Sequence, residues 1–139
     1  MSAAYSAVPD ARLIVLGISG LVTRTEALVL QNTLLNDPAL GPGTEMLVRA
    51  TDTRPDLSAR DIIDISRGTR ALAKRGLRRI VIVANSLLAY ALARIFATFA
   101  ESPSCSVHVF HTEEDALAWL TDTREESIVT EQERRWWSP

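Results

Sequence analysis

The feature that most constrains this chain is a regular alternation between short apolar runs and segments with helical periodicity. Four runs have the length of strands: Leu13–Ile18, Met46–Ala50, Ile80–Ala84 and Ser106–Phe110. Helical segments follow them at Thr25–Asn36, Ser58–Arg75, Leu87–Glu101 and Thr112–Leu120. This alternation over short connections predicts an α/β fold, with a mostly parallel sheet of about four or five strands and helices on its faces. A further strand at Tyr5–Val8 is predicted at the sheet edge, where it can run antiparallel.

The length of the chain predicts one folded domain. At 139 residues it falls within the usual range of about 100–200 residues per domain. The strand–helix units occupy residues 1–121, and residues 122–139 are predicted to be a C-terminal tail that is partly ordered or packed on the domain or on a second subunit. One cysteine and two histidines exclude a disulfide framework and a multi-thiolate metal site. We therefore predict neither a metal nor a cofactor.

Charge and hydropathy argue against two classes of partner. The formal net charge of -2 provides no overall basic field, and the basic run Arg67–Arg79 is interpreted as a solvated helix face near a helix C-terminus. We predict no nucleic-acid partner. The longest apolar stretch, Ile80–Ala100, is interrupted by Asn85, Ser86 and Arg94, which indicates a strand, a turn and a helix rather than a membrane span. With no signal-peptide pattern at residues 1–10, a cytoplasmic protein is expected.

Polar residues follow the predicted strands. Because ligands of open α/β sheets bind at the carboxyl ends of the strands, these residues form a predicted ligand or partner rim. The first strand is expected to end at Ser19 and Gly20, and residues 52–57 are expected to be a loop containing Pro55. The rim residues are Ser19, Asp52, Asp56, Asn85, Ser86 and His111. Each is also of a type that turns and helix caps select for purely structural reasons.

No complete catalytic motif is present. The run Gly17–Leu21 has a leucine where a nucleophile elbow has its second glycine, and the chain has neither a P-loop nor a G-x-G-x-x-G run. A triad from Ser19 or Ser86 with His111 and Asp52 is conceivable, but most rims of this kind offer such a combination. We predict a protein that is not an enzyme and assign no catalytic residue.

The predicted third helix, Leu87–Glu101, is apolar on nearly all sides. Its inward stripe is predicted from helical spacing as Leu88, Ala91, Leu92, Ile95 and Phe99, which leaves Leu87, Tyr90 and Phe96 outside it. Such a helix needs cover beyond the sheet. Three kinds of cover are open: the tail with Trp136 and Trp137, a second subunit in a homodimer, or a lipid-like ligand beneath the helix.

Several runs resemble a known family. Leu13–Gly20 (LIVLGISG), the strand Ile80–Ala84 followed by a helix containing Tyr90–Arg94, and the ending Val109–Leu120 are similar to the SpoIIAA-like group of STAS proteins, the sulfate transporter and anti-sigma-factor antagonist domains. The resemblance implies a mixed sheet with helices on its faces and an N-terminal edge strand. It also implies action through protein contacts, while the wider set resembles lipid-binding domains of the CRAL-TRIO type.

The resemblance also implies a phospho-acceptor candidate. In the antagonists, a D-S-S-G run opens a helix, and its second serine is phosphorylated by a partner kinase. The matching run is Asp56-Leu57-Ser58-Ala59, which places Ser58 at the acceptor position and departs at Leu57 and Ala59. Ser58 is equally explained as a helix N-cap. The first functional hypothesis is therefore a regulatory interaction domain, with a kinase-type anti-sigma factor as the implied partner. The alternative is a binder of a lipid or small apolar ligand, and a serine hydrolase is less favoured.

Overall fold

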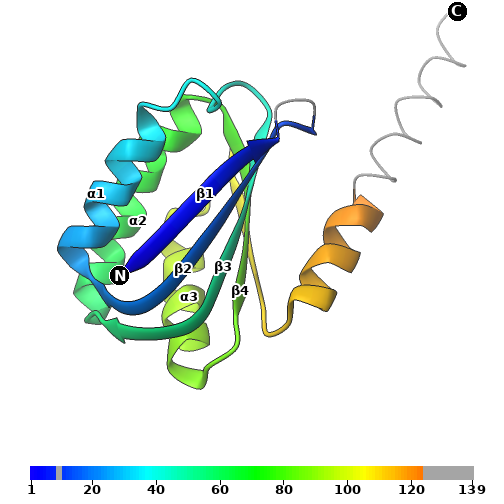
Figure 1. Ribbon diagram of the computed structural model, residues 1–139. Helices are drawn as coiled ribbons and strands as arrows, with labels where there is room; N and C mark the ends of the chain where they lie inside the picture. The colour runs from blue at the N-terminus through cyan, green and yellow to red at the C-terminus, as the bar shows by residue number, and fades with distance from the viewer. Residues whose placement is uncertain (9–10, 124–139) are drawn as a thin grey trace, which may run out of the picture.

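The computed structural model describes residues 1–8 and 11–123, which form one mixed β-sheet with helices on both faces (Figure 1). The strands follow chain order in the sheet: β1 (Ser2–Val8), β2 (Leu13–Thr23), β3 (Thr44–Asp56), β4 (Leu77–Ala84) and β5 (Ser106–Phe110). β1 is antiparallel to β2, and all other neighbours are parallel. The predicted α/β fold and its antiparallel edge strand are confirmed.

The helices are divided unequally between the two faces. α1 (Arg24–Leu35), α2 (Ala59–Lys74) and α3 (Leu87–Ala100) each connect two neighbouring parallel strands. Because the strand order follows the chain and crossovers of this kind are right-handed, the three helices lie on the same face (Figure 1). The last helix, residues 113–123 in the described part of the chain, lies on the opposite face (Figure 1).

This division produces two cores. The larger core lies between the sheet and α1–α3, and the smaller one lies under the last helix, where Leu47, Val81 and Val83 contact Ala116 and Leu120. Strand residues alternate between the two, so that Met46 and Ile80 face the larger core while Leu47 and Val81 face the smaller. β4 is buried on both faces, which explains its unbroken apolar run.

β2 and β3 continue well past their predicted ends. The expected turn at Ser19 and the expected loop at 52–57 are wrong, because strand pairing resumes at Gly20↔Thr53 and runs to Thr23↔Asp56. Between Ile18↔Ala50 and Gly20↔Thr53, one residue of β2 faces two of β3, which is a β-bulge. Gly20 and Asp52 have positive φ angles of 79° and 56° at this point. The paired extension beyond the bulge curves toward the helices (Figure 1).

The predicted inward face of α3 is only partly correct, since Leu92 is buried and Ile95 packs beside it as expected. The buried residues of α3 are Ala89, Leu92 and Ala100, whereas Leu88 and Phe99, predicted to face inward, are 54% and 46% exposed. Only Arg94 is charged within the helix, so the sequence carries little polar contrast from which to infer its rotation. Leu87, at the start of α3, is 86% exposed.

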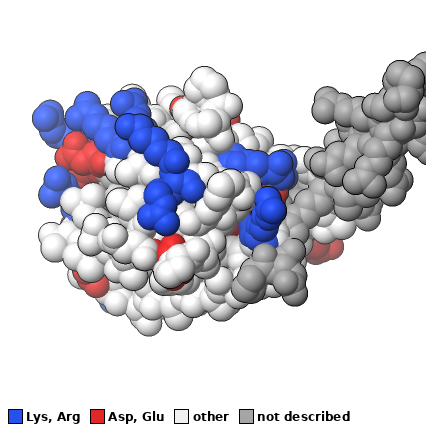
Figure 2. All heavy atoms as spheres, turned by 90° about the horizontal axis from the view of Figure 1, so that it is seen from above, with Lys and Arg blue, Asp and Glu red and all other residues white. Residues whose placement is uncertain are grey.

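The basic run Arg67–Arg79 is partly engaged in structural contacts. The Arg75 guanidinium donates to the carbonyls of Leu35 and Leu40, at 2.7 and 3.3 Å. Arg78 pairs with Glu45 at 2.5 Å. Figure 2 shows the end of the molecule at which α1 and α2 finish. Basic side chains, with acidic ones among them, gather there on the side of the helices. These positions suit cations because helix C-termini present free carbonyl groups.

The start of α2 is a capping box. The Asp61 amide donates to Ser58 Oγ at 3.1 Å, and the Ser58 amide donates to the Asp61 carboxylate at 2.9 Å. The predicted helix start is therefore confirmed.

Removing this cap is expected to destabilise the fold. Ser58→Ala is expected to lower the free energy of unfolding by about 1 kcal/mol, because the Asp61 amide in the first turn loses its acceptor, Ser58 Oγ. Ser58→Asp restores an acceptor at the N-cap and is expected to stay close to the wild type. Urea unfolding of the three proteins measures the difference. An alanine variant as stable as the wild type would contradict the assignment.

Candidate functional site

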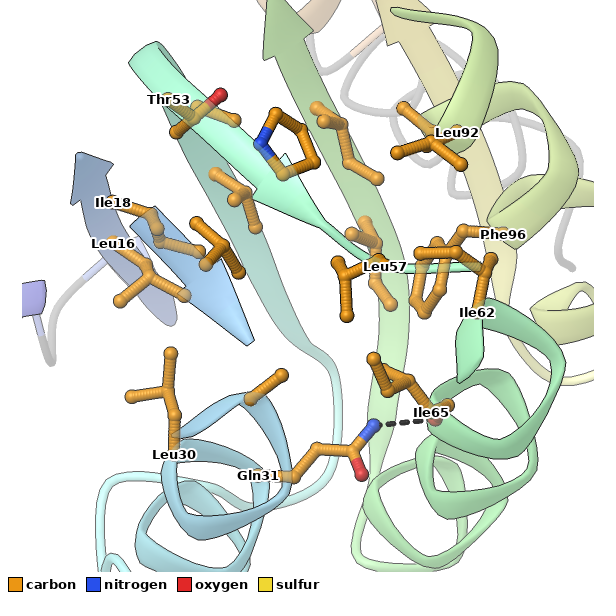
Figure 3. A pocket seen from close by; sticks show the side chains of 18 of the residues that line it. Leu16, Ile18, Leu30, Gln31, Thr53, Leu57, Ile62, Ile65, Leu92 and Phe96 are labelled. Atoms are coloured by element: carbon orange, nitrogen blue, oxygen red, sulfur yellow. Dashed lines mark hydrogen bonds between the residues drawn. The ribbon is translucent and has the colours of Figure 1, made fainter. Parts of the chain in front are cut away.

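A cavity of about 200 Å³ lies between the sheet and the helices, beneath α3 (Figure 3). β2, β3 and β4 form one wall, and α1, α2 and α3 form the other. Nearly all of the lining is apolar. The aliphatic and aromatic side chains include Leu16, Ile18, Val22, Leu30, Leu34, Met46, Val48, Leu57, Ile62, Ile65, Leu72, Ile80, Ile82, Leu92 and Phe96.

Small side chains leave part of this space open. Ala50 on β3, Ala27 on α1, and Ala89 and Ala93 on α3 face the cavity. Each of these positions contributes only a methyl group to the packing between helix and sheet, where larger residues usually interdigitate. These small side chains therefore leave space between the helices and the sheet.

The strand extension beyond the bulge closes one side of the cavity. The bulge adds one residue to β3 and so reverses which residues face the helices. Thr53, Pro55 and Leu57 line the cavity for this reason, while the alternate residues are exposed. In Figure 3 the extension passes from Thr53 toward Leu57 and the start of α2. These cavity residues were missed because a loop was expected at 52–57.

The polar side chains in the cavity are Gln31, Thr53 and Thr69. Gln31 Nε2 donates to the Ile65 carbonyl at 2.6 Å and to Thr69 Oγ1 at 3.3 Å (Figure 3). Gly68 permits this contact, since a Cβ there would lie 2.2 Å from Gln31 Oε1. The amide therefore joins α1 to α2. No charged side chain lines the cavity in the described part of the chain.

The predicted rim residues occupy separate places. Ser19 lies inside β2 at the bulge, Asp52 lies at the bulge in β3, and Asp56 is the last residue of β3. Asn85 follows β4 and is exposed. None of these four residues lines the cavity.

The other two rim residues have local contacts. Ser86 caps α3 by accepting from the Ala89 amide at 3.1 Å. The His111 ring stacks on Tyr90, with the ring centroids 3.7 Å apart. Within residues 1–8 and 11–123, no hydrogen bond or ion pair joins any two of the six rim residues, so no serine–histidine pair is assembled there. Their role as ligand or partner contacts stays a prediction.

A second group of side chains lies on the opposite face of the sheet. Trp119 of the last helix packs on His108, with the ring centroids 4.2 Å apart, and the Arg79 guanidinium lies 5.1 Å from the Trp119 ring. Arg49 forms an ion pair with Glu113 at the start of the same helix. These contacts hold the last helix against β3, β4 and β5, and His108 packs on the face of the sheet.

Acidification is expected to weaken this packing through His108. Burial lowers the pKa of His108 below its ordinary value, with Glu101 opposing the shift and Arg79 adding to it. The neutral ring is therefore favoured in the folded state. Its contribution is complete above the ordinary pKa of about 6.5 and is lost as the pH falls through the lower folded value. Urea unfolding gives the free energy of unfolding at about pH 7.5 and about pH 5. Between these two pH values, this free energy is expected to fall less for His108→Gln than for the wild type. Equal losses would contradict this.

The described residues contain neither a metal-binding cluster nor a membrane-spanning helix. No group of three or more His, Cys, Asp or Glu side chains in residues 1–8 and 11–123 is arranged to hold a metal ion. Over the same residues, no helix has the length and apolar character needed to cross a membrane.

Comparison with known proteins identifies the type of fold. The sequence matches no protein-family model and no curated protein. Among solved structures, the chain is similar to an uncharacterized protein of the DUF3478 family from Shewanella loihica PV-4, which is described as having a SpoIIAA-like fold. The TM-score is 0.53 at 21% sequence identity, and the match covers 86% of this chain and 92% of the other. The fold is SpoIIAA-like. The resemblance predicted from the sequence is thus confirmed for the fold, and the SpoIIAA-like sheet and its helices are the frame that holds the cavity.

Proposed function

We propose that this SpoIIAA-like protein binds a small, apolar, lipid-like molecule in the cavity beneath α3. The observation that carries the proposal is the cavity itself: about 200 Å³ of space lined by apolar side chains from three strands and three helices. Burial of a hydrocarbon chain contributes about 0.8 kcal/mol per CH₂ group. A chain of about eight carbons would gain roughly 6 kcal/mol before the costs of association are subtracted.

The size of the cavity limits the ligand. Pockets for drug-sized ligands usually measure about 300–1,000 Å³, and an engineered apolar cavity of about 150 Å³ holds benzene. A cavity of about 200 Å³ suits a single short chain or ring, or one end of a longer molecule. Binding of this kind requires no catalytic group.

Native mass spectrometry tests the proposal. Protein purified from its own host, and protein incubated with a lipid extract, are expected to show a defined added mass that is lost on denaturation. The cavity-filling variant Ala93→Phe, treated in the same way, is the control for binding outside the cavity. A clean mass for the unliganded protein under both conditions would count against lipid binding.

A regulatory role through Ser58 is a second candidate. It is supported by the SpoIIAA-like fold and by the exposed position of Ser58 at the start of α2. A phosphate there would lie at a helix N-terminus, which favours negative charge. Incubation with a kinase-type anti-sigma factor, followed by intact mass measurement, tests this role with Ser58→Ala as the control. A partner that neither phosphorylates nor binds the wild type would argue against it, and size-exclusion chromatography would show whether a homodimer forms.

A further inference from the structure

We infer that the ligand carries one uncharged hydrogen-bonding head group, such as the hydroxyl of an alcohol, and that the Thr53 hydroxyl binds it. This inference rests on the proposed function, because it names the chemical class of the molecule that the apolar cavity takes. Thr53 is then the residue that selects the chemical class of the ligand.

Among the polar side chains that line the cavity in the described residues, Thr53 has the hydroxyl without a protein partner, whereas the Gln31 amide oxygen can only accept a hydrogen bond. Of the other polar side chains that line it, Gln31 donates to Ile65 and Thr69, and the Thr69 hydroxyl donates to the Ile65 carbonyl at 3.4 Å. The Thr53 hydroxyl has no hydrogen-bond partner among residues 1–8 and 11–123. As both donor and acceptor, it matches a ligand hydroxyl in either direction.

The positions of these groups set the direction of the ligand. In Figure 3, Thr53 and Gln31 lie at opposite ends of the cavity, with apolar side chains such as Ile18 and Leu57 between them. A ligand whose polar end reaches Thr53 therefore places its apolar body among these side chains.

Charge decides between a neutral and an ionised head group. The charged neighbours of Thr53 in sequence, Asp52 and Arg54, are exposed and do not line the cavity. Arg24, at the start of α1, lies 3.5 Å from Asp64 and 3.9 Å from Asp61. Met1 also lines the cavity, and its N-terminal ammonium is already paired with Glu26 at 2.9 Å. A carboxylate beside Thr53 would therefore have to compete with Glu26 for this cation, and an unpaired ion in apolar surroundings is strongly disfavoured.

The helix N-termini nearby do not compensate for this. Glu26 lies in the first turn of α1 and Asp61 in the first turn of α2, so both positive ends already have an acidic partner. The first turn of α3 contains no acid, but Ser86 satisfies its Ala89 amide. A neutral head group thus fits these surroundings better than an anion.

Competition binding tests the inference. The neutral fluorescent probe N-phenyl-1-naphthylamine is displaced from the wild type by 1-octanol, 1-chlorooctane or octanoate at about pH 8, where octanoate is ionised. We expect 1-octanol to bind about five-fold more tightly than 1-chlorooctane, the gain expected for one neutral hydrogen bond. Octanoate is expected to bind at least about ten-fold more weakly than 1-octanol.

Thr53→Val is the decisive variant, since it keeps the β-branched shape and removes the hydroxyl. It is expected to bind 1-octanol about five-fold more weakly, with no change for 1-chlorooctane. Thr51→Val, on the same strand but outside the cavity lining, is the matched control and is expected to bind like the wild type. Thermal unfolding of both variants verifies that they are folded.

The outcomes separate the two proposals. If 1-octanol and 1-chlorooctane bind the wild type equally, or if Thr53→Val binds them as the wild type does, the inference is overturned and the proposed function stands. Tighter binding of octanoate overturns the neutral head group. If the probe and all three compounds fail to bind, the proposed function and the inference are overturned together.

Discussion

The Ala93→Phe variant is expected to bind apolar ligands at least about a hundred-fold more weakly than the wild type and to remain folded. Ala93 lies on α3 and faces the cavity of about 200 Å³. A phenyl ring at this position would occupy space that about three or four methylene groups of a ligand require. At about 0.8 kcal/mol per methylene, the lost burial amounts to roughly 3 kcal/mol. Displacement of N-phenyl-1-naphthylamine by 1-octanol measures the change.

Ala91→Phe is the matched control for this variant. Ala91 lies two residues earlier on the same helix, where its side chain is exposed. The substitution adds the same ring outside the cavity, so affinity is expected to stay close to that of the wild type. Equal binding by the Ala93→Phe and Ala91→Phe proteins would show that ligands bind elsewhere.

Gly76→Ala is expected to produce the largest loss of stability, about 3 kcal/mol. Gly76 ends the turn between α2 and β4 with a φ of 116°, a region that residues with a side chain rarely adopt. A Cβ there would lie 2.4 Å from the Gly41 carbonyl oxygen and 2.5 Å from Pro42 Cα. Both are backbone atoms, and the Gly43 amide donates to the Gly76 carbonyl at 3.1 Å, so the two loops can separate only by losing this contact. Backbone strain and overpacking each cost about 1–3 kcal/mol.

Gly41→Ala tests whether the effect is specific to Gly76. Gly41 belongs to the facing loop, and a Cβ added to it would have no neighbour within 4 Å. Its free energy of unfolding is expected to change by less than about 0.5 kcal/mol. Urea unfolding of both variants gives the comparison. A Gly76→Ala protein as stable as the wild type would mean that the two loops are not in contact.

Elements with strong local signals were predicted closely from the sequence. α2 is an example, because Ser58 and Asp61 form its N-terminal cap and Gly76 follows its end. Apolar residues with helical spacing between these signals identify its buried face, which includes Ile62, Ile65 and Leu72. β4 was equally clear from its apolar run. In each case residues close in sequence carry the information.

The candidate site was predicted only in outline. The apolar character of α3 indicated that something must cover this helix, but only part of its inward face was predicted correctly: Leu92 is buried, whereas Leu88 and Phe99 are exposed. The lining from Thr53, Pro55 and Leu57 was missed, although a usable signal exists: these residues alternate with Asp52, Arg54 and Asp56, as in a strand with one exposed face. The proline and the density of polar residues favoured a loop instead.

By itself, the sequence determined the order of strands and helices and the α/β class, because propensity, spacing and capping are local properties. The SpoIIAA-like fold was implied by the resemblance of runs such as Leu13–Gly20 to that group. The cavity was decided only by the tertiary structure. It depends on the bulge that turns Thr53 toward the helices and on the packing of α1–α3 against the sheet. Ala50 on the sheet and Ala93 on α3 both face the space between these layers, and their side chains are too small to fill it. A local pattern shows which side of an element is apolar, but the distance between two packed elements depends on side chains from distant parts of the chain.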